Sequence, residues 1–300
     1  MGWAREKDGA VTPDRPKVAV LGLGTMGAAM AASARRAGLP LVVWNRSPAA
    51  GADLAAQGVE VAHSATEAVE QAELVITMVT NADAVLSVAT EGGLLGALKP
   101  GAVWAQMSTI GIEATGRLAA MADEQRPDTY FVDAPVSGSK VPARRGQLLI
   151  FASGPDKARP RVAPVFDAIG QRTLWLGPAG QGSRMKLVNN VLLAFTAEGV
   201  ANAFALAHRL GLETDSVVEA FDGGPLVSPW ESAKFRRIAR GDYSEEFALA
   251  LALKDVNLAL SEAGSERFAV LAALAEEWTT IVNDGLGYED VTVVTRALAT

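Results

Sequence analysis

A glycine-rich turn near the N-terminus constrains the fold of this chain more than any other feature. The apolar run at residues 18–21 leads into the sequence GLGTMG at residues 22–27, and an alanine-rich stretch follows. A strand, a tight glycine turn and a helix in this order place the free N–H groups of the helix N-terminus beneath a pyrophosphate. The glycine spacing alone also fits an ordinary turn, but its context favours dinucleotide binding. The candidate contacts are Gly22, Leu23, Gly24, Thr25, Met26 and Gly27.

An α/β architecture follows from the pattern beyond this turn. Between residues 17 and 177, short β-rich runs alternate with alanine-rich helical stretches, as in βαβ units around a parallel sheet. Residues 183–210 contain no proline and are apolar on nearly every side, which predicts one long, buried helix. Further helical patterns continue to the C-terminus, so we place a domain boundary near residues 178–182. The expected strands are residues 17–21, 41–44, 74–79, 103–107, 131–133, 148–152 and 173–176.

Composition excludes several classes of protein. The chain holds 27 Lys and Arg residues against 34 Asp and Glu residues, and this net charge of −7 argues against a nucleic-acid partner. It has no cysteine and only two histidines, so we expect neither thiolate chemistry nor a metal site. Residues 1–16 lack the apolar run of a secretory signal, and no uninterrupted apolar segment reaches the ~20 residues that span a bilayer. We therefore expect a cytoplasmic protein with no membrane partner.

The residues after the second expected strand bear on the choice of dinucleotide. Asn45 follows Gly22 at close to the ~20-residue spacing at which an acidic residue binds the ribose of NAD. No acid is present here, and an arginine with small polar neighbours suits a 2′-phosphate instead. We therefore expect NADP(H) in preference to NAD(H), bound in part by Asn45, Arg46 and Ser47. The alternative is that Arg46 is a solvated surface charge.

A lysine and an asparagine near the start of the long helix are the candidate catalytic pair. Lys186 and Asn190 are four residues apart, so they project from one helical face. Because a mostly apolar run follows Lys186, its amine either snorkels from the helix end or takes part in proton chemistry. Ordinary helix packing remains the alternative for this face.

Two further segments add polar groups, and a third adds candidate cofactor contacts. The sequence DAPVSGSK at residues 133–140 follows a strand and offers hydroxyl and backbone N–H groups to an anion, unless it is a simple loop. Lys254 and Asp255 interrupt an apolar run and fit either a ligand site or an internal ion pair. At the end of the third expected strand, the candidate cofactor contacts are Met78, Val79 and Thr80.

Together, the GLGTMG turn, the DAPVSGS segment, the KLVNN helix start and the KD pair resemble the β-hydroxyacid dehydrogenase family. The resemblance covers nearly the whole chain from Val18 onward, and residues 136–148 look most like the glyoxylate/succinic semialdehyde reductase branch. It implies an N-terminal Rossmann doubly wound sheet, a long interdomain helix and an all-α C-terminal domain, commonly packed as a homodimer. Residues 1–16, with four charged residues at 5–8 and prolines at 13 and 16, are expected to form a flexible tail. The units that follow are an NADP-binding Rossmann domain over residues 17–179, and the interdomain helix with a helical substrate and dimerisation domain over residues 180–300.

The resemblance also implies roles for individual residues. The lysine that matches Lys186 donates a proton in that family, and the asparagine that matches Asn190 helps orient the substrate. Ser137 and Gly138 match residues that hold the substrate carboxylate. The full set of further implied positions is Ser137, Gly138, Ser139, Phe247 and Asp255 for the substrate, with Thr109 and Lys254 for the cofactor.

The function implied by the resemblance is an NADPH-dependent oxidoreductase. It would transfer hydride between the nicotinamide and a small aldehydo or keto acid, or its hydroxy acid, of the glyoxylate, succinic semialdehyde or 3-hydroxyisobutyrate type. An imine reductase on the same fold is one alternative, but such enzymes usually carry another residue in place of Lys186. A non-catalytic cofactor-binding module is the other, and Lys186, Asn190 and Ser137 disfavour it.

Overall fold

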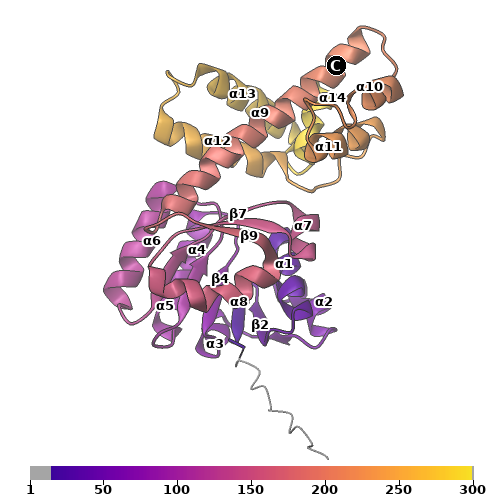
Figure 1. Ribbon diagram of the computed structural model, residues 1–300. Helices are drawn as coiled ribbons and strands as arrows, with labels where there is room; N and C mark the ends of the chain where they lie inside the picture. Colours follow the sequence, from indigo (N-terminus) through magenta and orange to yellow (C-terminus); the bar gives the residue numbers. More distant parts are fainter. Residues whose placement is uncertain (1–14, 299–300) are drawn as a thin grey trace, which may run out of the picture.

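A parallel six-stranded sheet forms the centre of the N-terminal half of the protein (Figure 1). The computed structural model describes residues 15–298; of the tail expected over residues 1–16, residues 1–14 lie outside the described residues. In sheet order the strands are β3 (Glu60–Val61), β2 (Leu41–Trp44), β1 (Val18–Leu21), β4 (Leu74–Thr77), β5 (Val103–Gln106) and β6 (Tyr130–Asp133). Each strand is parallel to its neighbours. This is the doubly wound, Rossmann-like order that the glycine turn predicts.

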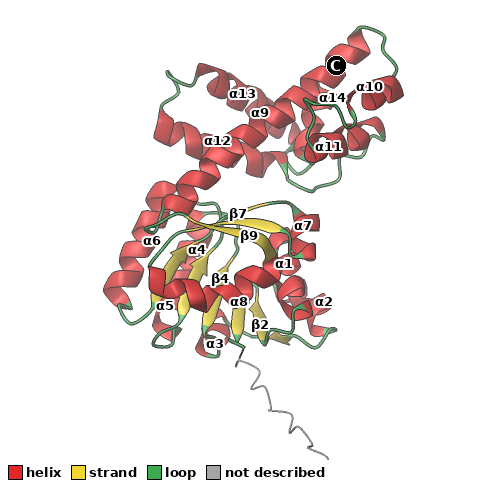
Figure 2. Ribbon diagram, viewed as in Figure 1, coloured by secondary structure: helices red, strands yellow, loops and turns green. Residues whose placement is uncertain are grey.

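Helices cover both faces of this sheet (Figure 2). In β1, Val18 and Val20 pack into one hydrophobic core, whereas Ala19 and Leu21 pack into the other. Both faces of the strand are therefore buried, as a parallel sheet between two layers of helices requires. The helices of the first core are α1 (Thr25–Arg36), α2 (Ala52–Ala55), α7 (Lys140–Arg145) and α8 (Arg159–Ile169), and those of the second are α3 (Ala65–Glu70), α4 (Ala82–Ala89), α5 (Leu94–Ala97) and α6 (Ile112–Gln125).

A second sheet of three strands adjoins the first. Its strands are β7 (Val136–Ser137), β8 (Leu148–Ala152) and β9 (Gly170–Trp175), with β8 antiparallel to β7 and parallel to β9. A bridge between Asp133 and Ser153 connects the two sheets. All the expected strands are present, with their ends shifted by at most a few residues. The additional strands β3 and β7 are two residues long, too short to carry an alternating pattern.

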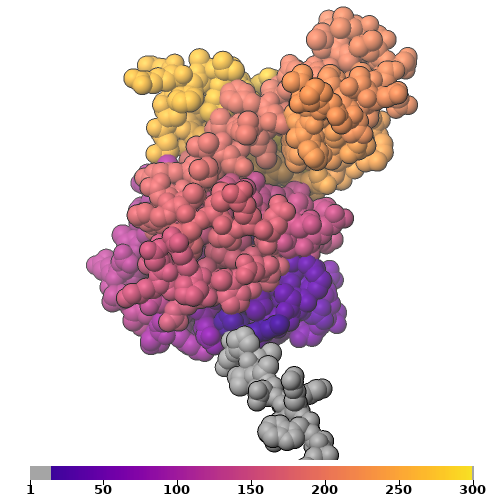
Figure 3. Space-filling model, in the orientation of Figure 1, coloured from indigo at the N-terminus to yellow at the C-terminus, as the bar shows by residue number. Residues whose placement is uncertain are grey.

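One long helix, α9 (Gln181–Arg209), leaves the sheet region and continues through the helical C-terminal region (Figure 1). In the space-filling view the helical part sits above the part that holds the sheets (Figure 3). The other helices of this region are α10 (Thr214–Phe221), α11 (Pro229–Ala239), α12 (Leu249–Ala263), α13 (Ala269–Ile281) and α14 (Val294–Leu298). Because α12, α14 and α11 all pack along α9, this helix connects the sheet edge to the helical core.

The prediction that this helix is buried on all sides is wrong. Val188 and Leu192 are 66% and 69% exposed, and Met185 and Phe195 are also exposed. Their spacing of three or four residues places all four on one face of α9. The neighbouring helices cover the other side, where Ala194 is buried. The apolar composition of a helix predicts that its surface is buried. It does not indicate whether the residues that bury it belong to the same chain.

Among the described residues, α9 is also the one helix that is long and apolar enough, by length and composition, to cross a membrane. Asn190 donates a hydrogen bond to Asp255 on α12, and Glu198 accepts one from the indole of Trp278 on α13 at 2.8 Å. Polar contacts of this kind with neighbouring helices are typical of a central helix in a helical domain.

A buried carboxylate attaches the start of α9 to the end of β6. Asp133 accepts hydrogen bonds from the Ser183 backbone N–H at 2.8 Å, from the Ser183 hydroxyl at 2.7 Å and from the Ser153 hydroxyl at 3.0 Å. Burial raises the pKa of Asp133, and the hydrogen bonds from Ser183 and Ser153 oppose this shift. The Asp133 carboxylate lies against the first turn of α9, where the helix dipole favours negative charge. The register of α9 relative to the sheet is thereby set.

The close packing of this helix start gives a stability prediction. A methyl group added at Gly182 would lie 2.2 Å from the Phe151 carbonyl oxygen and 2.9 Å from that of Asp133. We expect Gly182→Ala to lower the free energy of unfolding by about 1–3 kcal/mol in a denaturant titration. Gly116→Ala on α6 is the control, at an exposed helical glycine where a methyl group meets nothing within 4 Å and better helix propensity should add about 0.5–1 kcal/mol. Equal effects at the two positions would contradict this account.

Candidate functional site

The residues predicted to bind a dinucleotide meet at the carboxyl edge of the large sheet. The glycine turn follows β1, residues 45–47 follow β2, residues 78–80 follow β4, and Thr109 follows β5. The chain runs outward from β1 through β2 to β3 and then crosses back to β4 on the other side of β1, so the strand order reverses between β1 and β4. Doubly wound proteins bind their ligands outside the carboxyl ends of the strands at such a switch point.

The three glycines of the turn have different steric roles. Gly22 has φ of +101°, and a Cβ there would lie 2.3 Å from the carbonyl oxygen of Met78. At Gly27 a Cβ would lie 2.0 Å from the carbonyl oxygen of Gly22. Gly24, by contrast, is exposed and has nothing within 4 Å of the Cβ position. The first and third glycines thus allow α1 to pack against the strands, and the second leaves the approach to α1 open.

The N-terminus of α1 fits an anion. The first N–H groups of any α-helix have no acceptor within the helix, and in α1 no side chain caps them and the first turn holds no acidic residue. The helix dipole adds partial positive charge at the same place. The chain's own residues therefore fit a dinucleotide pyrophosphate at this point.

Asn45 shapes this turn from the end of β2. Its side-chain oxygen accepts a hydrogen bond from the Leu23 N–H at 2.9 Å, and its amide nitrogen donates to the Ser47 carbonyl oxygen at 3.0 Å. Asn45 is thus used for positioning, beyond the cofactor contact predicted for it. Arg46 is exposed and makes no hydrogen bond or ion pair to any residue in 15–298, so its guanidinium remains available to a ligand.

Asn190, one of the two predicted catalytic residues, lies in a polar network that links α9, α12 and the segment after β5. The amide of Asn190 donates to one carboxylate oxygen of Asp255, and the other oxygen lies 2.9 Å from the ammonium of Lys254. Lys254 also donates to the carbonyl oxygen of Thr109 at 2.5 Å. Lys254 and Asp255 were expected to form either a ligand site or an internal ion pair. They form the ion pair and also lie beside the catalytic candidates, so the two interpretations are compatible.

Lys186 lies one helical turn before Asn190 and is half-buried. Burial lowers the pKa of Lys186 to about 8, while the charge of Asp255 raises it and that of Lys254 lowers it. The amine is therefore mostly protonated at neutral pH, yet it gives up its proton far more readily than an ordinary lysine. A pKa close to the working pH is what a proton donor requires.

The predicted substrate residues on the small sheet and in the helical region are partly exposed. Ser137 lies in β7, Gly138 follows with φ of +127°, and Ser139 precedes α7 without capping it through its side chain. Phe247 packs against the helical core and donates its backbone N–H to Asp290 at 3.1 Å. Within residues 15–298 no hydrogen bond joins these four residues to Lys186, so their contact with a substrate stays a prediction.

Several polar residues that hold the site were not predicted. Asp133 and Ser183 fix the start of α9, and Ser108 accepts a hydrogen bond from the Val79 N–H at 2.8 Å, which holds the segment after β4. A polar residue that ends an apolar strand was the available signal for Asp133. Ser183 and Ser108 have no such signal, because their partners are distant in the sequence.

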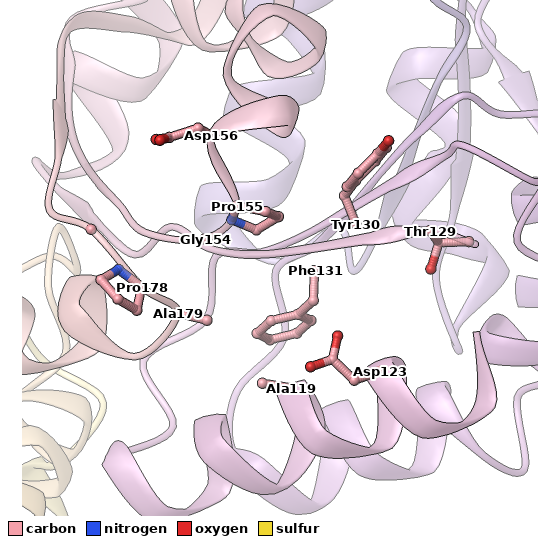
Figure 4. A pocket seen from close by; sticks show the side chains of 11 residues that line it. Ala119, Asp123, Thr129, Tyr130, Phe131, Gly154, Pro155, Asp156, Pro178 and Ala179 are labelled. Atoms are coloured by element: carbon pink, nitrogen blue, oxygen red, sulfur yellow. The ribbon is translucent and has the colours of Figure 1, made fainter. Parts of the chain in front are cut away.

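A cavity of about 470 Å³ lies apart from these residues, between α6, the start of β6 and the loops that follow β8 and β9 (Figure 4). Asp123 and Asp156 are its charged lining residues, and no cationic side chain lines it. Two carboxylates without a cation do not suit the phosphates of a dinucleotide or the carboxylate of a small acid. None of the residues predicted for the site lines this cavity.

Comparison with known proteins covers both halves of the chain. Residues 17–177 match the NAD binding domain of 6-phosphogluconate dehydrogenase, and residues 180–298 match the NAD-binding domain of NADP-dependent 3-hydroxyisobutyrate dehydrogenase. The chain is 31% identical to glyoxylate/succinic semialdehyde reductase 1 of Arabidopsis thaliana over 285 residues, covering 94% of this chain and 98% of that protein. It is 32% identical to the NAD-dependent L-serine dehydrogenase of Pseudomonas aeruginosa over 290 residues, covering 93% and 97%. The crystal structure of 3-hydroxyisobutyrate dehydrogenase from Salmonella typhimurium aligns with a TM-score of 0.86 at 30% identity, covering 94% of this chain and 99% of that one.

The environment of Lys186 predicts how its amine titrates. We expect trace labelling with an amine-reactive reagent, followed by mass spectrometry, to give a pKa of about 8 for this residue. Asp255→Asn removes the charge that raises this pKa, so the pKa should fall further. Asp284→Asn, at an exposed position on the distal helical region, should leave it unchanged. Titration at the ordinary lysine value, or an upward shift in Asp255→Asn, would contradict the assigned environment.

Proposed function

The chain belongs to the β-hydroxyacid dehydrogenase family, and from that premise we propose that it is an NADP(H)-dependent enzyme acting on a small aldehydo or keto acid. The substrates proposed are of the glyoxylate, succinic semialdehyde or 3-hydroxyisobutyrate type. One observation supports this most directly: the half-buried amine of Lys186 lies one turn from the Asn190–Asp255 pair, on the helix that begins at the carboxyl edge of the sheet.

The proposed chemistry divides between the cofactor and the chain. When bound, the reduced nicotinamide supplies hydride to the carbonyl carbon of the substrate. Lys186 donates a proton to the carbonyl oxygen as negative charge develops there, and it takes the proton back in the oxidation of the hydroxy acid. Asn190, held by Asp255, orients the substrate, while Ser137 and Gly138 bind its carboxylate.

The preference for NADP(H) rests on the end of β2. An acid that would accept hydrogen bonds from an NAD ribose is missing there, and Arg46 is exposed and unpaired among the described residues. A guanidinium suits a 2′-phosphate because it offers several N–H donors in one plane. Since a relative of similar identity is named as NAD-dependent, the preference depends on these local residues rather than on the family.

The two alternatives to this function are less well supported. An imine reductase of the same fold usually has another residue where this chain has Lys186. A non-catalytic module would have no use for an amine whose pKa is lowered by burial beside a fixed amide and carboxylate.

We also propose that two copies of the chain associate through the exposed face of α9. Val188 and Leu192 are the most exposed apolar residues of that face, with Met185 and Phe195 beside them. A continuous apolar stripe on a helix favours burial against another surface, and a second copy is the commonest partner. Light scattering of the purified protein would report twice the mass of one chain, and a monomer mass would contradict the proposal.

Replacing the lysine tests the function most simply. We expect Lys186→Ala to lower kcat/KM for NADPH-dependent reduction of glyoxylate or succinic semialdehyde by about 10²–10⁴, because it removes the proton donor. The Kd for NADPH, measured by fluorescence, should not change. In the wild type, reduction should slow as pH rises through about 8 while hydroxy-acid oxidation speeds up, since only the neutral amine accepts a proton. Lys157→Ala, at an exposed position, is the control; near wild-type activity in Lys186→Ala would remove the lysine from the mechanism.

A second variant tests the choice of cofactor. Arg46→Ala should weaken NADPH binding about tenfold and leave NADH binding unchanged, because only NADPH carries the 2′-phosphate. Arg172→Ala, another exposed arginine, should affect neither. Equal weakening of both cofactors, or of neither, would show that Arg46 does not read the phosphate.

A further inference from the structure

A buried ion pair in the helical region has no part in the proposed chemistry. The ammonium of Lys234 on α11 lies 2.9 and 3.0 Å from the two carboxylate oxygens of Asp290, and the two residues are 2% and 0% exposed. Lys234 also donates to Glu246 at 2.9 Å. Burying charges costs several kcal/mol for each ion unless the geometry is good. The presence of a buried ion pair at this position therefore needs an explanation.

The pair and its neighbours hold one short segment, residues 242–247. Asp290 accepts hydrogen bonds from the backbone N–H groups of Glu246 and Phe247 at 3.3 and 3.1 Å. From the next turn of α11, Arg237 contacts the carboxylates of Asp242 and Glu246 at 3.2 and 3.0 Å. The segment is thus attached by charged contacts at both of its ends to α11 and to Asp290, which lies before the short 3-10 turn that leads into α14.

This fixed segment presents one carboxylate to the other half of the protein. Glu245 is exposed, and its Oε1 lies 3.5 Å from the hydroxyl of Thr25 in the first turn of α1. Within residues 15–298 Glu245 makes no other hydrogen bond. Because α1 has no acid of its own in the first turn, Glu245 supplies negative charge from the helical region to the end of α1 that favours anions.

We propose that Glu245 and the phosphates of the dinucleotide compete for the first turn of α1, and that Lys234, Asp290 and Arg237 are positioning residues that hold Glu245 there. A carboxylate and a pyrophosphate at one helix N-terminus repel each other. Glu245 therefore weakens binding of the dinucleotide in both its oxidised and its reduced form. This inference depends on dinucleotide binding at the glycine turn, and it does not depend on the substrate or on Lys186.

The direct test is the dissociation constant of NADPH and of NADH, measured by fluorescence titration at low and high salt. Glu245→Gln keeps the shape of the side chain and removes its charge. We expect it to bind both cofactors about threefold to tenfold more tightly at low salt, with a smaller gain at high salt because ions screen the repulsion. The control is Glu213→Gln, an exposed glutamate beside α10, which should have no effect. Unchanged or weaker binding in Glu245→Gln would overturn the proposal, and weaker binding would identify Glu245 as a ligand of the cofactor.

A second variant separates positioning from general damage to the fold. Arg237→Lys keeps the charge but loses the fork that contacts Asp242 and Glu246 together, so it should release the segment and tighten cofactor binding in part. In the Glu245→Gln background, Arg237→Lys should have little further effect on cofactor binding, because both substitutions act through the carboxylate of Glu245. If Arg237→Lys weakens binding equally in both backgrounds, Arg237 supports the fold rather than Glu245, and the positioning role is overturned.

Discussion

The hydrogen bonds between Asp133 and the first turn of α9 determine where the catalytic candidates lie. Asp133 ends the last strand of the large sheet, and Ser183 gives it both a backbone N–H and a hydroxyl. A second hydroxyl, that of Thr115 on α6, lies 3.0 Å from the Ser183 hydroxyl and joins the same buried group. Since Lys186 follows Ser183 within one helical turn, a shift in the register of α9 would move its amine relative to the dinucleotide turn.

A second set of contacts holds the opposite side of Lys186. Lys254 reaches from α12 to the carbonyl oxygen of Thr109, and its neighbour Asp255 holds the amide of Asn190. These contacts place one negative and one positive charge near the amine of Lys186, and their effects on its pKa oppose each other. Burial therefore decides the direction of the shift. The site joins a rigid sheet edge to a helical region through a few charged side chains, and Glu245 contacts α1 from that region.

Local patterns were enough to predict the fold and the cofactor turn. The glycines at 22 and 27 have no space for a Cβ, and steric demands of this kind are visible in a short stretch of sequence. The length of α9 was predictable for the same reason, because nothing in residues 183–210 interrupts a helix. Its exposed face was not predictable, since exposure depends on which distant helices pack beside it. The pairing of Asp133 with Ser183 joins residues fifty positions apart, and Lys234 with Asp290 fifty-six, so no periodicity reveals them. The role of Phe247 came from family resemblance alone, whereas Ser137 lies in a segment whose hydroxyl and N–H groups also suit an anion.

The central claim is that α9 brings the Lys186 amine to the reacting oxygen of a substrate bound beside the nicotinamide. A crystal structure of the protein with NADP⁺ and a small hydroxy acid measures this directly. The account predicts the Lys186 Nζ within hydrogen-bond distance, about 2.6–3.2 Å, of the hydroxyl oxygen, and the carbon that carries the hydroxyl about 3–3.5 Å from the nicotinamide C4. A hydroxy acid bound there with the amine directed to solvent, and another group on its hydroxyl, would contradict it.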